Sequence, residues 1–239
     1  MSILSNSPNY FLSSLSARDA ALLHPHLKPI ELPAANVLYK AEDVITRIYF
    51  PFTGIVSFVV GVASGEFVEA GVVGRNSAVG INASLDGAIA INEAIVQVAI
   101  TAATIEAGTF KGLAADSESM RVSCARHEEM TLGQVQQVAA CNALHNIEQR
   151  LARWLLQARD LLNSDLVPLT QEELSKMLGV NRSSVTLSAR RLQEAGLIDY
   201  HRGHIQLLDT DALKDVSCEC YEAINALFFR LIGWSPNNI

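Results

Sequence analysis

Long apolar runs are absent from this chain of 239 residues, although 49% of its residues are hydrophobic. No window approaches the roughly 18 uninterrupted apolar residues that a membrane-spanning helix requires. The N-terminus also lacks a basic segment followed by an apolar one, which is the pattern of a secretory signal. We therefore expect a cytoplasmic protein that does not associate with a membrane.

Cysteine is scarce, with 4 residues in the whole chain. Cys124, Cys141, Cys218 and Cys220 lack the C-x-x-C spacing of zinc sites, and they are too few for a disulfide scaffold in a chain of this size. Cys218 and Cys220 together offer only two thiols. We therefore expect reduced, structural cysteines, with no bound metal and no other cofactor.

Histidine is also scarce, and its placement argues against catalysis. After His24 and His26 the next histidine is His127, so no strand carries the His-x-His pair and following Glu of a cupin-like metal site. We expect His127 and His145 at a helix surface or an interface. No nucleophile, base and orienting residue can be grouped from the sequence, so we expect no enzyme. A cupin-like metalloenzyme with a fused helical domain stays as the alternative from another class, which elemental analysis would distinguish.

Basic residues are outnumbered, 18 against 25 acidic ones, and the formal net charge is -7. The segment 169–206 is the net positive part of the chain, and His201 and His204 add hydrogen-bond donors to it. Attraction to a polyanion would therefore have to come from one face of the molecule.

The first half of the chain is rich in short β-strand patterns. Val- and Ile-rich segments such as "GIVSFVVGV" and "FVEAGVV" alternate with glycine, proline and polar turns. A short helix that Ser16 can cap precedes them. This spacing predicts an antiparallel β sandwich or jelly roll, which we assign to residues 1–116.

A helical segment follows, because residues 117–162 contain no proline and Gly133 as the only glycine. It is longer than most globular helices, so we expect a break near Asn142, a coiled coil, or both. A weak heptad seam suited to a dimer interface comprises Thr131, Val135, Val138 and Asn142. The alternative is an ordinary helix that lies on its own β domain. We assign dimerisation and interdomain helices to 117–163 and a further domain to 164–239, because Pro168 cannot continue a helix.

The segment "LTQEELSKMLGVNRSSVTLSARRLQ" predicts two short helices joined by a tight turn. Thr170 followed by Glu173 is a capping box that opens the first helix. Gly179 permits the turn, and Asn181 can cap the second helix. A strand-turn-strand pattern, "LIDYHRGHIQLLD", follows directly and has a basic tip. This order predicts a winged helix-turn-helix that binds DNA, and the alternative is a helical hairpin with a solvated basic face.

The candidate DNA contacts are side chains that can donate to or accept from base edges and phosphates. They are Thr170, Gln171, Arg182, Ser183, Ser184, Thr186, Leu187, Arg190, His201, Arg202 and His204. Arg182 could take a guanine, whereas Leu187 could only touch a thymine methyl group or pack.

The whole chain resembles the bacterial Crp/Fnr transcription regulators, the cyclic AMP receptor-like proteins. "IYFPFTGIVSFVV" and "GEFVEAGVVGRNSAVG" resemble the family's sensor jelly roll, and "CNALHNIEQRLARWLLQARDLL" resembles its interdomain helices. The resemblance implies a homodimer that binds a palindromic operator in double-stranded DNA, with RNA polymerase as a further candidate partner. In the base-reading turn, regulators of the cyclic AMP receptor type carry Arg-Glu and then a second Arg one helical turn later. This chain has Arg182-Ser183 and Leu187 there, so its operator should differ.

The resemblance also implies a pocket in which a short helix and a loop surround the phosphate of a cyclic nucleotide. In that pocket a Glu contacts the ribose hydroxyl, and an Arg-Ser pair stands just before a strand. The matching positions form a degenerate pocket of Gly74, Arg75, Asn76, Ser77, Asn92 and Glu93, in which Asn76 replaces the Glu. Between Arg75 and Arg121 the only basic residue is Lys111. We therefore expect that cyclic AMP and cyclic GMP do not bind in the familiar way, so that the effector is unknown. The alternative is a regulator that needs no ligand and uses its β domain only as a dimerisation scaffold.

Overall fold

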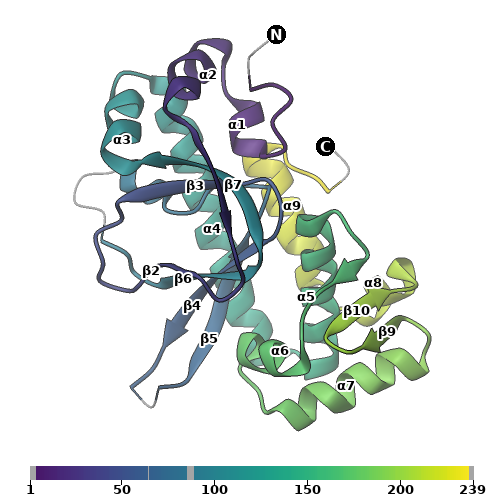
Figure 1. Ribbon diagram of the computed structural model, residues 1–239. Coiled ribbons are helices and arrows are strands. Elements are labelled where there is room, and N and C mark those ends of the chain that lie inside the picture. The colour runs from purple at the N-terminus through teal and green to yellow at the C-terminus, as the bar shows by residue number, and fades with distance from the viewer. Residues whose placement is uncertain (1–3, 64, 85–88, 237–239) are drawn as a thin grey trace.

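The computed structural model describes residues 4–63, 65–84 and 89–236. Figure 1 shows a β-rich half and a helical half, with the long helix α4 (Glu118–Leu144) running between them. In the described part of the chain, no helix is long and apolar enough to cross a membrane.

The β-rich half is built from two antiparallel sheets, with strand orders β1-β7-β3 and β2-β6-β4-β5. The strands are β1 (Lys28–Leu32), β2 (Val37–Tyr39), β3 (Arg47–Pro51), β4 (Ile55–Gly61), β5 (Phe67–Val73), β6 (Glu93–Val98) and β7 (Ile100–Glu106). Gly54 has a φ of +78°, and a Cβ there would lie 2.2 Å from the Ala99 carbonyl oxygen. Only glycine fits this turn, which brings β4 in beside the end of β6.

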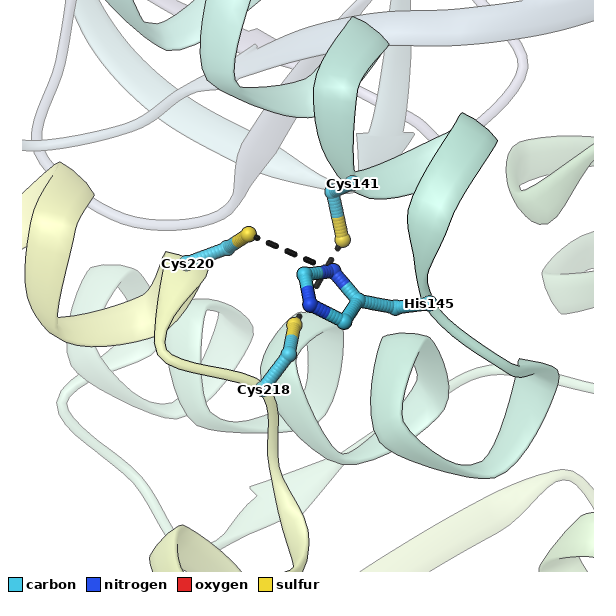
Figure 2. Close-up of side chains that lie close together, drawn as sticks. All are labelled: Cys141, His145, Cys218 and Cys220. Carbon is cyan, nitrogen blue, oxygen red and sulfur yellow. Dashed lines mark hydrogen bonds between the residues drawn. The ribbon is translucent and has the colours of Figure 1, made fainter.

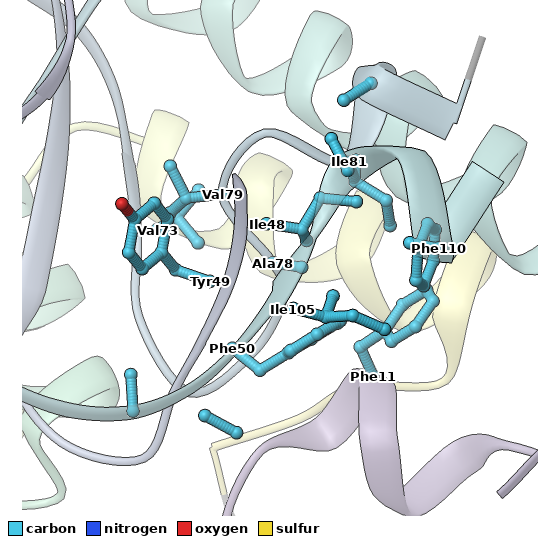
Figure 3. Packing of buried hydrophobic residues seen from close by; sticks show 14 of the residues in the cluster. Phe11, Ile48, Tyr49, Phe50, Val73, Ala78, Val79, Ile81, Ile105 and Phe110 are labelled. Atoms are coloured by element: carbon cyan, nitrogen blue, oxygen red, sulfur yellow. The ribbon is translucent and has the colours of Figure 1, made fainter. Parts of the chain in front are cut away.

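Short helices close the open side of the sheets. They are α1 (Tyr10–Ser14), α2 (Ala17–Leu23), η1 (His24–His26), η2 (Ile81–Ser84) and α3 (Ala107–Ala115). The predicted cap is present, because Ser16 accepts a hydrogen bond from the Asp19 backbone N–H. Phe11 of α1 stacks on Phe50 of β3 with ring centroids 5.5 Å apart, and Phe110 of α3 contacts both rings (Figure 3). These rings fill the core of the β domain, where burying an aromatic side chain contributes most.

The predicted long helical segment forms two helices. After α4 the chain breaks at His145 and Asn146, and α5 (Ile147–Leu162) begins with a capping box in which Asn146 and Gln149 cap each other. Nearly all of α5 is buried, because it packs on the C-terminal helices on one side and on the β domain on the other.

The C-terminal half holds the predicted helix-turn-helix and wing. Its elements are β8 (Leu166–Val167), α6 (Gln171–Leu178), α7 (Arg182–Glu194), β9 (Ile198–His201), β10 (His204–Leu207), α8 (Thr210–Val216) and α9 (Cys220–Ile232). The wing strands and β8 form a small sheet of order β8-β10-β9. An antiparallel β domain, a long helix and a winged helix-turn-helix are all present, so the predicted fold class is confirmed.

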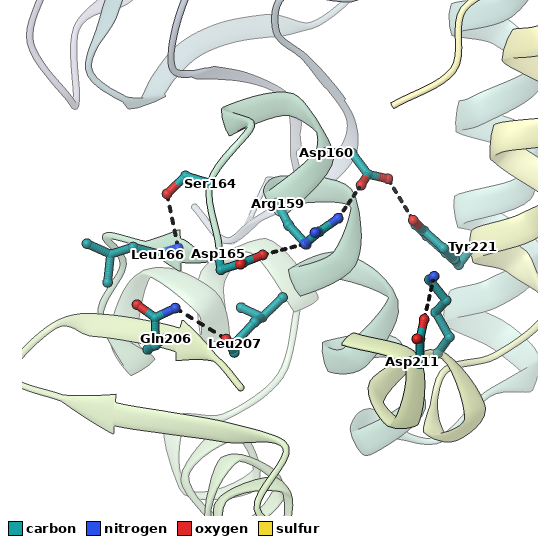
Figure 4. A network of polar contacts seen from close by, with 10 residues as sticks. Arg159, Asp160, Ser164, Asp165, Leu166, Gln206, Leu207, Asp211 and Tyr221 are labelled. Carbon is teal, nitrogen blue, oxygen red and sulfur yellow. Dashed lines mark hydrogen bonds and ion pairs between the residues drawn. The ribbon is translucent and has the colours of Figure 1, made fainter. Parts of the chain in front are cut away.

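Helix α9 leaves the winged domain and packs along α4. Met130 and Val138 of α4 share a buried cluster with Ile224, Phe228 and Trp234. The start of α9 is also tied to α5, where the Tyr221 hydroxyl donates a 2.7 Å hydrogen bond to buried Asp160 (Figure 4). The C-terminal segment therefore joins the helix that follows the β domain to the helix that begins the winged domain.

Candidate DNA-binding surface and sensor domain

The helix-turn-helix is built by local capping. The Thr170 hydroxyl accepts a 3.2 Å hydrogen bond from the Glu173 backbone N–H, and Glu173 accepts one of 2.7 Å from the Thr170 N–H. Gly179 ends α6 with a φ of +62°, and Asn181 caps α7 by accepting from the Ser184 N–H at 2.9 Å. The capping box, the glycine turn and the second cap predicted from the sequence are all confirmed.

Helix α7 lies along the outer edge of the molecule, away from the β domain (Figure 1). Arg182, Ser183, Thr186 and Leu187 are exposed on its outward side, and Leu187 is 52% exposed. In the described part of the chain, Arg182 forms no ion pair within 4.0 Å. The first turn of α7 therefore presents a free guanidinium, hydroxyl groups and one apolar side chain at a helix N-terminus.

Several of the predicted contacts, Arg190 and Ser184 among them, have partners within the protein. Arg190 pairs with Glu194 at 2.7 Å, four residues further along α7. Ser184 is half-buried, and its hydroxyl donates to Asn181 at 2.7 Å, so it also supports the cap. These residues stiffen α7, and an exposed ion pair of this kind contributes little energy of its own.

The wing lies next to the start of α6 and α7. His201 of β9 pairs with His204 of β10, and Arg202 at the tip is exposed with a φ of +47°. A Cβ on Gly203 would lie 3.3 Å from the Thr170 side chain, so the wing tip touches the N-terminus of α6.

Hydrogen bonds extend this contact to the second helix. The Gln171 N–H donates to the Tyr200 hydroxyl at 3.4 Å, and the Thr186 hydroxyl donates to the Gln171 side chain at 2.6 Å. The contacts connect the wing, the start of α6 and α7 in one continuous surface.

The β domain contacts the helix-turn-helix directly. A cavity of about 580 Å³ lies between the β4–β5 hairpin and α6, lined by residues that include Val60, Phe67, Val68, Lys176 and Val180. At its edge, a Cβ on Gly179 would lie 2.9 Å from Val68. Movement of the hairpin would therefore reach the turn between α6 and α7.

A buried carboxyl group lies at the same boundary. Glu69 of β5 accepts hydrogen bonds of 2.6 Å from the Ser57 hydroxyl and of 2.6 Å from the Trp154 indole N–H. Burial raises the pKa of Glu69 to about 7, although these two hydrogen bonds and the charge of Arg153 oppose the increase. Glu69 thus connects the β domain to α5 through a group that titrates near neutral pH.

The structure does not assemble the pocket predicted at residues 74–77 and 92–93. Val56 of β4 pairs with Val73, whereas Val59 pairs with Glu93, so Gly74 and Glu93 lie near opposite ends of β4. Four residues of a strand span about 13 Å. The predicted pocket is therefore wrong as a single site.

The first part of that predicted pocket is used for packing instead. Arg75, Asn76 and Ser77 are buried, and Ser77 contacts His127 at 2.7 Å. A Cβ on Gly74 would lie 3.1 Å from Leu161 of α5, so this loop faces the interdomain helix. Residues 85–88 of the segment lie outside the described residues.

The short helix expected beside a cyclic phosphate places Ile81, five residues after the predicted Asn76, at the position of the Glu. Gly80 has a φ of +80° and leads into η2, so that buried Ile81 stands at the start of the helix. Burial raises the pKa of half-buried Glu128 on α4, and the nearby Asn82 backbone N–H opposes this increase. A carboxyl group of the protein therefore lies beside the start of η2, where a phosphate would need backbone N–H donors.

The predicted dimer seam does not lie on the free face of α4. Val138 is 6% exposed and packs against α9 of its own chain, and Val135 faces Gly71 of β5. Thr131 and Asn142 are half-buried. Val138 is therefore covered by α9 of its own chain, whereas a dimer contact through Thr131, Val135 or Asn142 stays a prediction.

His127 is also not a surface residue. It is 2% exposed, its ring meets Phe11 edge-on with centroids 5.0 Å apart, and burial lowers its pKa to about 3. The ring is therefore a neutral part of the core.

Three of the cysteines and one histidine lie together, which the sequence analysis missed. Cys141, His145, Cys218 and Cys220 place their ligand atoms within 4.8 Å of one another. A hydrogen bond from the Cys218 thiol lowers the pKa of the Cys141 thiol, burial opposes this change, and the nearby Arg153 lowers the pKa further. The available signals were the four-residue spacing of Cys141 and His145 on one helix and the C-x-C pattern at 218–220.

One segment of the chain matches a family model by sequence, and the fold matches several solved structures. Residues 149–216 match the family model of the Crp-like helix-turn-helix domain. No curated protein matches the chain by sequence.

Several solved structures resemble most of the chain. FixK2 from Bradyrhizobium japonicum aligns with a TM-score of 0.69 and 13% identity, covering 80% of this chain and 98% of FixK2. TTHB099, a CRP family transcriptional regulator from Thermus thermophilus, aligns with a TM-score of 0.66 and 21% identity. The alignment covers 79% of this chain and 96% of TTHB099. TTHA1359, a CRP/FNR family regulator from the same organism, aligns with a TM-score of 0.61 and 20% identity. The alignment covers 80% of this chain and 98% of TTHA1359.

These similarities agree with the order of elements and with the capped helix-turn-helix described above. The resemblance found in the sequence is confirmed. The chain carries a Crp-like helix-turn-helix domain within the fold of the Crp/Fnr transcription regulators.

Proposed function

We propose that this protein is a transcription regulator that binds a palindromic operator in double-stranded DNA as a homodimer. The observation that carries the proposal is the outward first turn of α7, where Arg182 is exposed and unpaired in the described part of the chain. A recognition helix of this kind inserts its N-terminal residues into the major groove. Arg182 would donate two hydrogen bonds to a guanine, and Leu187 would contact a thymine methyl group.

The wing would hold the phosphate backbone beside that groove. Arg202 is exposed at the tip, and the contact of Gly203 with Thr170 sets its position relative to α6. Because the rest of the chain is acidic, phosphate attraction would be confined to this surface. Non-specific binding should therefore be weak compared with operator binding.

The two copies would meet on the free face of α4. Val122, Leu132, Ala139 and Ala143 are exposed there, at spacings that continue one heptad stripe. Leu132 is 58% exposed. A second copy would bury this stripe and hold the two α7 helices one turn of DNA apart.

The experiment that tests the proposal is selection of bound duplexes from a random DNA library with the full chain. A palindromic motif with a guanine in each half-site supports it. Failure to enrich any motif, with or without extracts of small molecules from the host cell, would rule out specific operator binding.

A second candidate is a regulator of the same DNA that needs no effector. The observation in its favour is Glu128, whose carboxyl group lies near the Asn82 N–H at the start of η2. A thermal-shift screen of nucleotides and other metabolites separates the two candidates. A ligand that raises the melting temperature and changes operator affinity supports an effector, and its absence across the screen supports the second candidate.

A further inference from the structure

Four metal-binding side chains converge between the end of α4 and the start of α9. Cys141 lies in the last turn of α4 and His145 caps that helix, whereas Cys218 and Cys220 frame the start of α9 (Figure 2). The four ligand atoms lie within 4.8 Å of one another. We propose that these residues bind one zinc ion in a tetrahedral Cys3His site.

The spacing of the ligand atoms fits a single ion. In a tetrahedral site with Zn–S bonds of about 2.3 Å, two sulfurs lie about 3.8 Å apart and a sulfur and a nitrogen about 3.6 Å apart. The Cys141 and Cys218 sulfurs are 3.5 Å apart, and the Cys220 sulfur is 3.6 Å from Nδ1 of His145. A multi-iron cluster spreads its ligands further, because its irons are separated from one another.

Neighbouring groups would support this ion from outside. Nε2 of His145 lies 3.2 Å from the Glu219 carboxylate, which would orient the ring so that Nδ1 faces the thiols. The Gln137 side-chain amide donates to the Cys220 sulfur at 3.1 Å. A carboxylate behind a ligating histidine and an N–H group directed at a thiolate are the usual outer partners of zinc sites.

The charge of the surroundings also favours metal-bound thiolates. Arg150 and Arg153 of α5 are buried, and neither forms an ion pair within 4.0 Å in the described part of the chain. Both are close enough to interact electrostatically with the thiol group of Cys141. Zinc with three thiolates and a neutral imidazole carries a charge of about −1, which would partly neutralise the two guanidinium groups.

The ligand types select zinc among common ions. Three sulfurs and one nitrogen, with no oxygen ligand, suit a thiophilic tetrahedral cation and not magnesium or calcium. The four positions would all be filled by the protein, so the site would be structural. It would fasten the hinge between α4 and α5 to the chain that leaves the winged domain. This assignment is independent of DNA binding.

The test begins with the metal content of the full chain purified without chelator and, separately, after incubation with Zn²⁺. We expect about one zinc per chain. Loss of an outer partner typically weakens metal binding about 10- to 100-fold. We expect a larger loss of zinc affinity in each of the ligand variants Cys141→Ser, Cys220→Ser and His145→Ala. The matched control is Cys124→Ser, because Cys124 is also buried on α4 but lies outside the cluster, and this variant should keep its zinc.

Cobalt substitution tests the geometry on the unmodified chain, whether or not the variants fold. Co²⁺ should give the strong visible bands of a tetrahedral site and sulfur-to-cobalt charge transfer in the near ultraviolet. A chain that holds no zinc after incubation overturns the proposal, and so does a metal-free chain with a Cys141–Cys218 disulfide. Iron with inorganic sulfide, or equal loss of zinc in Cys124→Ser, overturns it as well.

Discussion

The indole N–H of Trp154 donates a 2.6 Å hydrogen bond to the Glu69 carboxyl group, across the boundary between the β domain and α5. Trp154 is 1% exposed and Glu69 is 6% exposed, so water does not compete for this contact. Because the pKa of Glu69 is raised to about 7, the charge at this boundary changes in the physiological range. The contact between the two domains is therefore sensitive to pH.

The first prediction concerns stability and Glu69. The folded chain holds a proton on Glu69 between about pH 4.5 and 7, whereas the unfolded chain has released it. Stability contributed by this group therefore falls as the pH rises through that window, by up to about 3 kcal/mol. Glu69→Gln stays neutral, so its free energy of unfolding should increase relative to the wild type as the pH rises.

The measurement is urea unfolding of both proteins from pH 4 to pH 8. His127 acts in the opposite direction, because its folded pKa of about 3 makes stability rise with pH up to about 6.5. Taking the difference between variant and wild type removes this contribution, because both proteins contain His127. The matched control is Glu31→Gln on exposed β1, whose difference should be flat. A flat difference for Glu69→Gln as well would contradict the prediction.

The second prediction concerns base recognition by Arg182. Loss of a bidentate contact to guanine costs about 1 to 3 kcal/mol per half-site, so Arg182→Ala should weaken operator binding about 5- to 150-fold for each half-site. It should also relax the preference at one base position. Fluorescence anisotropy with the selected operator and with single-base variants measures both effects, and Arg18→Ala on exposed α2 is the control. Unchanged preference at every position would remove Arg182 from the interface.

The third prediction separates the wing from the recognition helix. Arg202→Ala should weaken all DNA sequences alike and reduce the slope of log affinity against log salt by about 1, because it removes one phosphate contact. The measurement is anisotropy between 50 and 300 mM salt, on operator and on random duplex. A change in base preference would instead place Arg202 in a groove.

The fourth prediction concerns the dimer. Leu132→Glu places a charge on the exposed heptad stripe, where burial without a partner is costly, and should produce monomers with weak operator binding. Leu187→Glu is the matched control, because Leu187 is similarly exposed at 52% but lies on α7, so the chain should stay dimeric. Light scattering at several concentrations gives the mass. A dimer that persists in Leu132→Glu would place the interface on another surface.

Local signals were enough to predict the helix-turn-helix. Thr170, Glu173, Gly179 and Asn181 act on neighbours within four residues, so their spacing in the sequence determines their contacts. The break in the long helix was also expected, although it falls at His145 and not at Asn142.

Contacts between distant segments could not be found in the same way. The grouping of Cys141 with Cys218 depends on α9 turning back along α4, and the sequence contains no pattern for that return. The burial of Val138, one residue of the predicted dimer seam, depends on the same return of α9. The pocket residues were misplaced because the sequence does not show whether Gly74 or Gly80 leads into the short helix, and that depends on how the chain folds after β5.

The last prediction is that cyclic AMP and cyclic GMP do not bind with micromolar affinity. The start of η2 offers buried Ile81 where the resemblance implies a Glu, and the Glu128 carboxyl group lies near its Asn82 N–H. A carboxylate about 4 Å from the phosphate would add roughly 1 to 4 kcal/mol of repulsion, depending on the effective dielectric constant. The absence of an arginine removes a charge-assisted hydrogen bond worth about 1.5 to 3 kcal/mol. Together these terms weaken binding by about two to five decades.

Glu128→Gln distinguishes the two terms, because it removes the repulsion and supplies no arginine. The variant should therefore still show no micromolar binding, since Lys111 is the only basic residue between Arg75 and Arg121. Isothermal titration calorimetry of both proteins with each nucleotide is the measurement. Micromolar binding to the wild type, displaced by unlabelled nucleotide in a competition assay, would show that the pocket is functional. Binding gained only in Glu128→Gln would show that the carboxylate alone blocks an otherwise competent site.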